Sequence, residues 1–159
     1  MSDTVETLPA LHVFRFAVSF RRVDNGHAVD LCHGAFSECT GLEATMEPKV
    51  IKSGGANYGA AQRAGPVSFA TVILKRGMTR TRDLTRWFQL VAGGAYGYRM
   101  TAEIALQDAA GKPAITWQLD RCLPVKFKAA DLNAKGTEVG VEELHLVHEG
   151  LRLRADGAS

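Results

Sequence analysis

One stretch of the 159-residue chain repeats its apolar side chains with the period of a helix more clearly than any other. Four apolar residues fall at i, i+3, i+4 and i+7 and form one stripe: Leu84, Trp87, Phe88 and Val91. Asp83 would place a negative charge near the positive end of such a helix, and Thr79 or Thr81 could cap its first turn. Gly93-Gly94 can end it. The pattern predicts a single helix over about 81–92.

The segment before this helix has the composition of a strand. Val67–Lys75 carries β-branched and apolar residues on both of its faces, and the Arg76-Gly77 step ends it. A strand that is apolar on both faces is typically covered on both faces. We therefore expect Val67–Lys75 to be a central strand, with Ile73 in the core and the helix lying on the sheet.

Apolar and polar residues alternate through four further segments, as they do in half-buried strands. These segments are His12–Phe20, Tyr98–Leu106, Ala114–Leu123 and Val139–His148. The Asp24-Asn25-Gly26 turn favours a hairpin with a return strand over about Ala28–Phe36. About seven or eight strands with one helix indicate a mainly β fold, an antiparallel sandwich or barrel. We expect a single domain over 1–159, with 1–10 loosely held. The predicted core residues are Phe16, Ile73, Leu84, Trp87, Phe88 and Trp117.

The segment from about 42 to 66 does not fit this pattern. It reads as a long extended hairpin around the Ser53–Asn57 turn, but it has few apolar residues and many small or polar ones. A two-stranded hairpin with so little apolar surface cannot hold itself against its own core. It is therefore either a mobile loop or a protruding hairpin whose partner lies on another molecule.

No pattern typical of catalysis is present. The sequence contains no GxSxG, GxxxxGK[ST], HExxH or paired CxxC motif. His145 and His148 would point to opposite faces of a strand, so they could not share one metal ion. The cysteines Cys32, Cys39 and Cys122 suggest small thiols in a reducing compartment. We expect no catalytic residue, no cofactor and no metal site.

Composition limits the expected partners. Nineteen Lys and Arg against seventeen Asp and Glu leave a formal net charge of +2, which gives no reason to expect nucleic-acid specificity. No apolar run is long enough to span a membrane, so no membrane anchor is expected. The segment MSDTVETLPA lacks the features of a signal peptide, and we expect cytoplasmic synthesis.

Several short pieces follow one another in a recognisable order. They are Phe36-Ser37-Glu38 with Gly41-Leu42, Gly54-Gly55 with Asn57, Leu74-Lys75-Arg76-Gly77, and Glu143-Leu144 with His148-Glu149-Gly150-Leu151. The ordered set resembles the tail-tube (inner tube) protein family of contractile phage tails and extracellular contractile injection systems. The resemblance covers about Phe14 to Leu151, nearly the whole chain.

This resemblance implies six copies to a ring and rings stacked into a hollow tube, around whose lumen the strands of all six copies join. The hairpin would then pack on neighbouring copies. The expected inter-subunit residues are Val50, Ile51, Gly54, Gly55, Asn57 and Tyr58. A sheath protein and baseplate or tube-cap proteins would be further partners, and the lumen could carry cargo.

Two surfaces follow from this arrangement. The outward helix face would meet the sheath through Arg80, Arg82, Arg86 and Gln89. The alternative for this basic row is a solvated helix face. The lumen would be lined by the polar faces of two strands, with Arg99, Thr101, Glu103 and Glu143. An aqueous bore tolerates polar residues that a sandwich core would not.

Alternatives remain at the level of the sequence. Lys49, Lys52 and the small Tyr58–Gly65 stretch depart from the family's usual acidic, longer arm, and Leu123 replaces a common aromatic. A tube-initiator or baseplate-proximal ring is therefore the second interpretation. From a different class, a monomeric β-barrel could hold a small ligand in its interior, but this would leave the hairpin unexplained.

Overall fold

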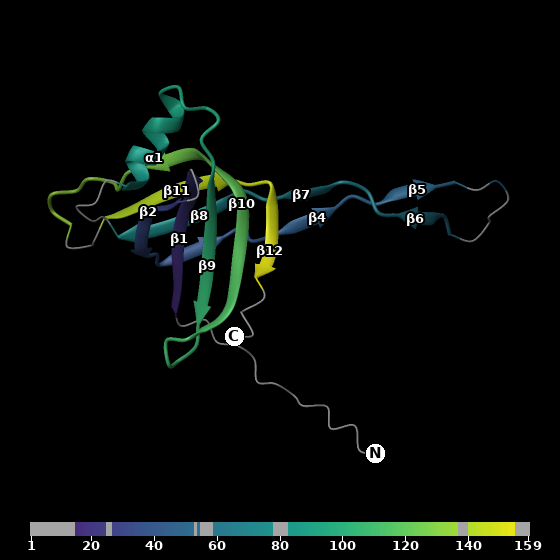
Figure 1. The fold of residues 1–159 in the computed structure, drawn as a ribbon, viewed down its shortest axis with the longest axis horizontal. Coiled ribbons are helices and arrows are strands. Elements are labelled where there is room, and N and C mark those ends of the chain that lie inside the picture. The colour runs from purple at the N-terminus through teal and green to yellow at the C-terminus, as the bar shows by residue number, and fades with distance from the viewer. Residues whose placement is uncertain are drawn as a thin grey trace, which may run out of the picture.

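The computed structural model describes residues 15–24, 27–52, 54, 59–77, 83–136 and 140–154. In chain order the elements are β1 (Arg15–Asp24), β2 (His27–Ala35), β3 (Glu38–Thr40), β4 (Ala44–Met46), β5 (Lys49–Ile51), β6 (Ala61–Arg63), β7 (Val67–Phe69), β8 (Val72–Gly77), α1 (Asp83–Ala92), β9 (Met100–Gln107), β10 (Pro113–Lys128), β11 (Val141–Val147) and β12 (Gly150–Arg154). The fold is mainly β with antiparallel pairing and a single helix in the described part, as predicted (Figure 1).

Eight strands form one sheet, and β10 is the strand that bends it. The order is β2-β1-β9-β10-β11-β8-β3, with β12 also paired to β10. The first part of β10 pairs with β9 and β12, and the part after Cys122 pairs with β11. The register shifts between Leu119 and Cys122, and Arg121 between them has a positive φ of 50°. Such an irregularity lets a strand change direction, so the sheet folds over on itself.

The core lies between the two halves of the folded sheet. Alternate residues of β1, β8, β9 and β11 point inward, and the helix closes one end, with Trp87 against Phe20 at a ring-centroid distance of 5.0 Å. The buried apolar residues include Val18, Phe20, Val72, Leu74, Leu84, Trp87, Val91, Met100, Ala102, Ile104, Leu119, Leu144 and Leu146. Phe16 and Trp117 are half-buried and pack against this cluster.

Three expectations about the core are wrong. Val67–Lys75 is not one strand, because Ala70 and Thr71 separate β7 from β8, which belong to different sheets. Within β8 burial alternates: Val72 and Leu74 are buried, while Ile73 is half-buried and lies outside the core cluster. Phe88 is likewise half-buried and outside the cluster. The apolar residues of β8 therefore belong to a strand with one buried face and one half-buried face, and not to a strand that is covered on both faces.

The long hairpin protrudes from the body as a thin arm made of two separate ladders (Figure 1). β4 pairs with β7 near the body, and β5 pairs with β6 farther out. The arm begins at Gly41, whose φ is +91° and where a Cβ would lie 2.0 Å from the Thr71 carbonyl oxygen. Only glycine fits there, because this conformation and this approach both exclude a side chain. We use "the arm" below for residues 42–70.

Candidate assembly surfaces

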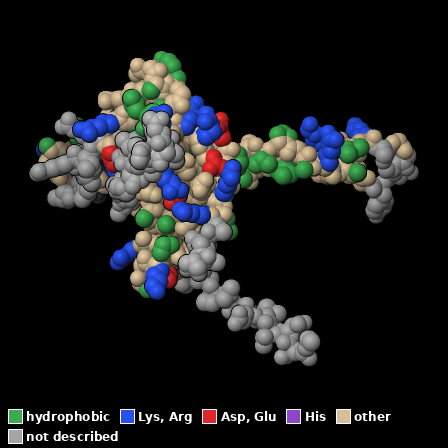
Figure 2. Space-filling view, in the orientation of Figure 1, with side chains coloured by type: hydrophobic (Ala, Val, Ile, Leu, Met, Phe, Trp, Pro, Cys, Tyr) green, Lys and Arg blue, Asp and Glu red, His purple; other side chains and the backbone are tan. Residues whose placement is uncertain are grey.

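The arm exposes apolar side chains along its length. Met46, Val50, Ile51 and Val67 are 45–57% exposed, and the basic residues Lys49, Lys52 and Arg63 lie exposed beside them. Figure 2 shows the arm as a narrow projection with hydrophobic and basic side chains. Exposed apolar side chains that gather on one projection usually mark a contact with another molecule. Of the predicted interface residues, Val50, Ile51 and Gly54 are exposed on the arm, while Gly55, Asn57 and Tyr58 lie outside the described residues.

His148 lies at the root of the arm and is only 8% exposed. Its ring stacks at an angle on Phe69 of β7, with centroids 4.9 Å apart. Its Nδ1 is 3.0 Å from the Gly150 carbonyl oxygen and donates to it, while Nε2 is buried without a hydrogen-bond partner. Burial lowers the pKa of His148, against the Gly150 hydrogen bond and the charge of Asp120, which raise it. The arm root thus rests on a neutral imidazole.

The start of the helix is fixed by a buried arginine. Arg76 is 2% exposed and its guanidinium pairs with both Glu142 of β11 and Asp83 of α1. Burial lowers the pKa of Arg76, but the hydrogen bonds and charges of Asp83 and Glu142 outweigh it, so the pKa is raised. Asp83 also accepts a hydrogen bond from the Leu84 N–H at 3.0 Å. The three side chains hold α1 on the ends of β8 and β11.

The outward face of α1 carries Arg86 and Gln89, both exposed, next to Leu90 at 46% exposed. Arg80 and Arg82 precede the helix and lie outside the described residues. The stripe formed by Leu84, Trp87 and Val91 points into the core, as the period predicts. The helix therefore offers a mixed polar and apolar surface on the side away from the sheet.

The folded sheet has two outer faces, and the residues predicted to line the lumen are divided between them. Thr101 and Glu103 lie on the outer side of β9, opposite the buried Met100, Ala102 and Ile104. Glu143 lies on the outer side of β11, opposite the buried Leu144 and Leu146. Because the core separates the two halves of the sheet, these outer faces point away from each other. Thr101 and Glu103 therefore do not share a surface of this chain with Glu143, and the lining of a lumen by any of the four residues stays a prediction.

We call the outer side of β1, β9, β12 and the first part of β10 the β9 face. Its charged centre is Glu103, a carboxylate with a 15% exposed side chain that pairs with both Arg21 of β1 and Arg154 of β12. Asp120 pairs with Arg152 at 2.7 Å and accepts a hydrogen bond from the Gln118 amide at 2.9 Å. Arg99 lies just before β9, with its guanidinium donating to the Tyr96 carbonyl at 2.6 Å.

We call the outer side of β3, β8, β11 and the last part of β10 the β11 face. There a row of alternating charge crosses four strands in register, in the order Glu38, Lys75, Glu143 and Lys128. Lys75 lies 3.6 Å from Glu38 and 3.7 Å from Glu143. The hydrogen bond with His145 lowers the pKa of Glu143, and the charges of Lys75 and Lys128 add to this. The charges of the β11 face largely compensate one another.

We also looked at the thiols, at possible metal-binding clusters and at the length of the helix in the described part of the chain. Burial raises the pKa of Cys39 to about 11 and that of Cys122 to about 12, so neither is a thiolate at neutral pH. In the described part of the chain no three metal-binding side chains come together, and no helix there is long and apolar enough to cross a membrane.

Comparison with known proteins decides the family. The family model described as "T4-like virus tail tube protein gp19" matches residues 12–152. The chain belongs to the T4-like virus tail tube protein family. No protein with a curated description matches this tail tube protein by sequence.

Solved structures agree with this membership. A chain of the anti-feeding prophage baseplate is 26% identical with a TM-score of 0.71, over 93% of this chain and 97% of that one. A chain of the PVC contractile injection system sheath–tube complex is 18% identical with a TM-score of 0.72, over 95% and 94%. A chain of the PVC sheath/tube terminator is 18% identical with a TM-score of 0.74, over 94% and 99%. The last two show the shared fold.

Family membership makes this tail tube protein a structural component of a contractile, phage-tail-like particle and points to a non-enzymatic role. The sequence reasoning missed the Arg76 cluster, although a signal was available. Arg76 follows Val72 and Leu74 at steps of two, so strand parity places it inside, and a buried arginine requires carboxylate partners.

Proposed function

We propose that this tail tube protein forms six-membered rings that stack into the hollow inner tube of a contractile particle. The observation that carries the proposal is the arm, a paired extension whose apolar side chains are left exposed by the described part of the chain. A two-stranded ribbon is marginally stable alone, so it needs a neighbouring copy to pack on. The similar baseplate chain comes from a six-fold symmetrised particle, which supports six copies.

The β9 face is the better candidate for the lumenal wall. Within the described residues β2 pairs only with β1, and β12 pairs only with β10, so this half of the sheet has a free edge on each side. Neighbouring copies can then continue it into a ring of strands, because unpaired edges are templates for pairing. The β11 half has only the three-residue β3 as a free edge. In this proposal Arg99, Thr101 and Glu103 face the lumen, and Glu143 does not.

The helix face is the proposed contact with the sheath. If the bore is lined by the β9 face, we expect the polar side of α1, with Arg86 and Gln89, to lie away from the bore. Arg80 and Arg82 come just before α1 in the sequence and are included in this proposed contact. Exposed ion pairs contribute only about 0–1 kcal/mol each, so many copies can grip a sheath and still release it. Replacing Arg80, Arg82 and Arg86 with Glu should leave tubes intact and prevent sheathed particles from forming. If the triple variant still gave sheathed particles that contract normally, these arginines would be ordinary solvent-exposed residues and not a sheath contact.

Other members of the assembly follow from the family. We propose cytoplasmic assembly before release, baseplate or cap proteins at the tube ends, and cargo in the lumen. A second candidate is a ring at the baseplate end of the tube, which the 26% identity to a baseplate chain favours. A monomeric ligand-binding barrel is disfavoured, because buried apolar side chains fill the inward positions of β1, β8, β9 and β11 where its ligand would have to lie.

The test of the proposal is a shortened arm. Replacing Val50–Gln62 with an Asn-Gly turn keeps the Lys49–Arg63 pair and removes the rest of the β5–β6 ladder, which makes no hydrogen-bonded ladder with the body. The shortened protein should remain folded by circular dichroism and elute as a monomer in light scattering, while the full chain forms rings. The control is Ala110→Asp in the exposed β9–β10 turn, which should assemble normally. Rings formed by the shortened protein would show that the arm is not the contact.

A further inference from the structure

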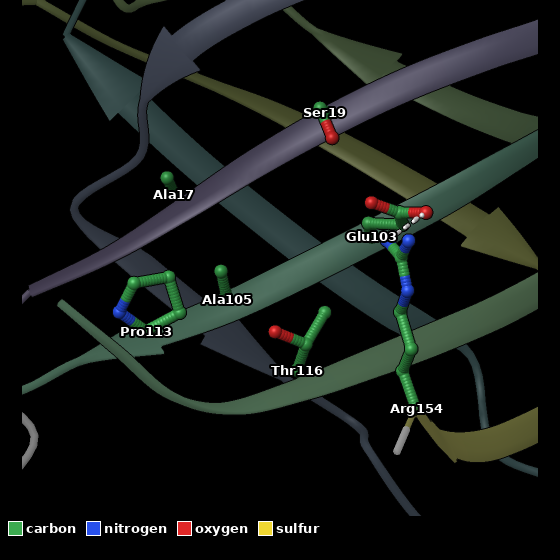
Figure 3. Close-up of a pocket in the computed structure, with 7 residues that line it drawn as sticks. All are labelled: Ala17, Ser19, Glu103, Ala105, Pro113, Thr116 and Arg154. Atoms are coloured by element: carbon green, nitrogen blue, oxygen red, sulfur yellow. Dashed lines mark ion pairs between the residues drawn. The ribbon is translucent and has the colours of Figure 1, made fainter. Parts of the chain in front are cut away.

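A hollow of about 310 Å³ lies on the β9 face, and its position is set by strand register (Figure 3). Ala17, Ala105 and Thr116 are direct cross-strand neighbours on β1, β9 and β10, and Arg154 of β12 continues the row. Three small side chains in register leave a depression between the taller side chains around them. Glu103 and Arg154 form one rim of it.

Two hydroxyl groups line this hollow without a partner. Thr116 is only 6% exposed, yet its hydroxyl makes no hydrogen bond within the described part of the chain, and the same holds for Ser19. The Thr116 oxygen is not among the fully buried atoms that lack a partner, so it is open to the hollow. The hollow therefore presents free donors to whatever enters it.

The charge at the rim is unbalanced. Arg21 and Arg154 share the single carboxylate of Glu103, with Arg154 Nη1 at 2.9 Å from Glu103 Oε1. Asp120, the other carboxylate of the β9 face, is already paired with Arg152. Among the described residues, the three arginines of these ion pairs therefore outnumber their two carboxylates by one. A guanidinium has five donors in a planar fork that matches a carboxylate or a phosphate, so each arginine retains donors for a second anion.

We propose that this hollow binds an Asp or Glu side chain of a polypeptide carried in the tube, with Arg154 and the Thr116 hydroxyl as its donors. The inference rests on the proposed function, because it requires the β9 face to line the bore. A hollow of this size suits a side chain, being at the lower end of ligand-site volumes. The hollow would be repeated in every copy around a ring and along the tube. A cargo with many carboxylates could then bind many weak sites at once and be retained.

The surrounding charges favour a polypeptide over a nucleic acid. Glu103 and Asp120 remain on the same face as the arginines, and the formal net charge of the chain is only +2. A phosphate backbone carries one negative charge per nucleotide, so the phosphates next to the one at the hollow would lie near Glu103 and Asp120 and be repelled. A polypeptide with spaced acidic residues can place its carboxylates at the hollows and its other residues elsewhere.

The experiment measures binding of a fluorescent Gly-Ser peptide with spaced glutamates to the purified full-length protein by anisotropy at low salt. Arg154→Gln should weaken binding about tenfold, and Thr116→Val about threefold, as expected for a charged and a neutral hydrogen bond. Lys126→Gln, an exposed lysine elsewhere on β10, and Thr101→Val, outside the hollow, are the matched controls and should bind as the unsubstituted protein does.

Three results would overturn the site: equal affinity of Arg154→Gln and Lys126→Gln, equal binding of the same peptide with lysines in place of glutamates, or tighter binding of an oligonucleotide of matched charge. The hollow is formed by one copy, so binding is measurable whatever the assembly state. Electron micrographs of the same sample separate the two ideas. Rings without an Arg154 effect overturn only the site, and the expected binding without rings overturns only the proposed function.

Discussion

Trp87 is the side chain that joins the helix to the sheet. It is 2% exposed and packs on Phe20, whereas its neighbour Phe88 is half-buried and outside the core. Trp87→Ala should lower the free energy of unfolding by about 3–5 kcal/mol, because a large cavity remains. Phe88→Ala is the matched control and should cost clearly less. Urea unfolding measures both. Equal losses would mean that the helix is rotated from the position described.

A second prediction at the scale of single residues concerns the carboxylate partners of Arg76. Glu142→Ala leaves the buried Arg76 guanidinium with one of its two carboxylate partners, Asp83, so the loss of unfolding free energy should approach the roughly 3–5 kcal/mol of a broken buried pair. The adjacent Glu143 points to the outer β11 face, and Glu143→Ala should cost much less. Thermal unfolding of the two variants, measured side by side, gives the comparison. If Glu143→Ala were the more damaging change, the inward and outward faces of β11 would be reversed.

The arm root should respond to pH through His148. Burial lowers its folded pKa below the ordinary 6.5, so the folded state prefers the neutral ring and binds fewer protons than the unfolded chain. The stability contributed by His148 is complete above pH 6.5 and is lost as the pH falls from there towards the lowered folded pKa. The slope should not exceed about 1.4 kcal/mol per pH unit for one proton.

The measurement is urea unfolding of the protein and of His148→Gln between pH 7.5 and 5, a range set around the ordinary histidine pKa. The variant cannot titrate at this position, so the difference in unfolding free energy between the two proteins should change with pH. Glu143 does not interfere, because its pKa is lowered from 4.5 and it titrates below this range. Parallel curves would show that His148 is not held neutral at the arm root.

At the scale of elements, the sequence predicted what local periodicity determines. The helix at Asp83–Ala92 and the strands β9 and β11 follow from alternation or a 3.6-residue period, and the arm followed from its missing apolar side. Periodicity could not show that Ala70 and Thr71 divide a strand, because both residues are compatible with extended structure. Nor could it show that β9 and β11 expose opposite sides of a folded sheet. That depends on the bend at Arg121, for which the local sequence gives no clear turn signal.

At the scale of the whole molecule the described residues form a folded sheet with a protruding arm, and in the proposed function this arm packs on a neighbouring copy (Figure 1). The order of sequence pieces was sufficient to identify the tail-tube family, and the family match over residues 12–152 confirms it. Which side chains meet a neighbour, the sheath or the bore is a property of the assembly. A single chain defines the free surfaces for those contacts but not their pairing.

The most direct measurement is electron microscopy of the purified full-length protein at rising concentration. We expect six-fold rings with an open centre, which stack into short tubes as the concentration increases, with the arms lying between neighbouring copies. Class averages should place the β9 face on the inside of the ring and α1 on the outside. Uniform monomeric particles at every concentration would rule out the proposed ring. Rings with α1 towards the centre would rule out the proposed orientation of the chain within it.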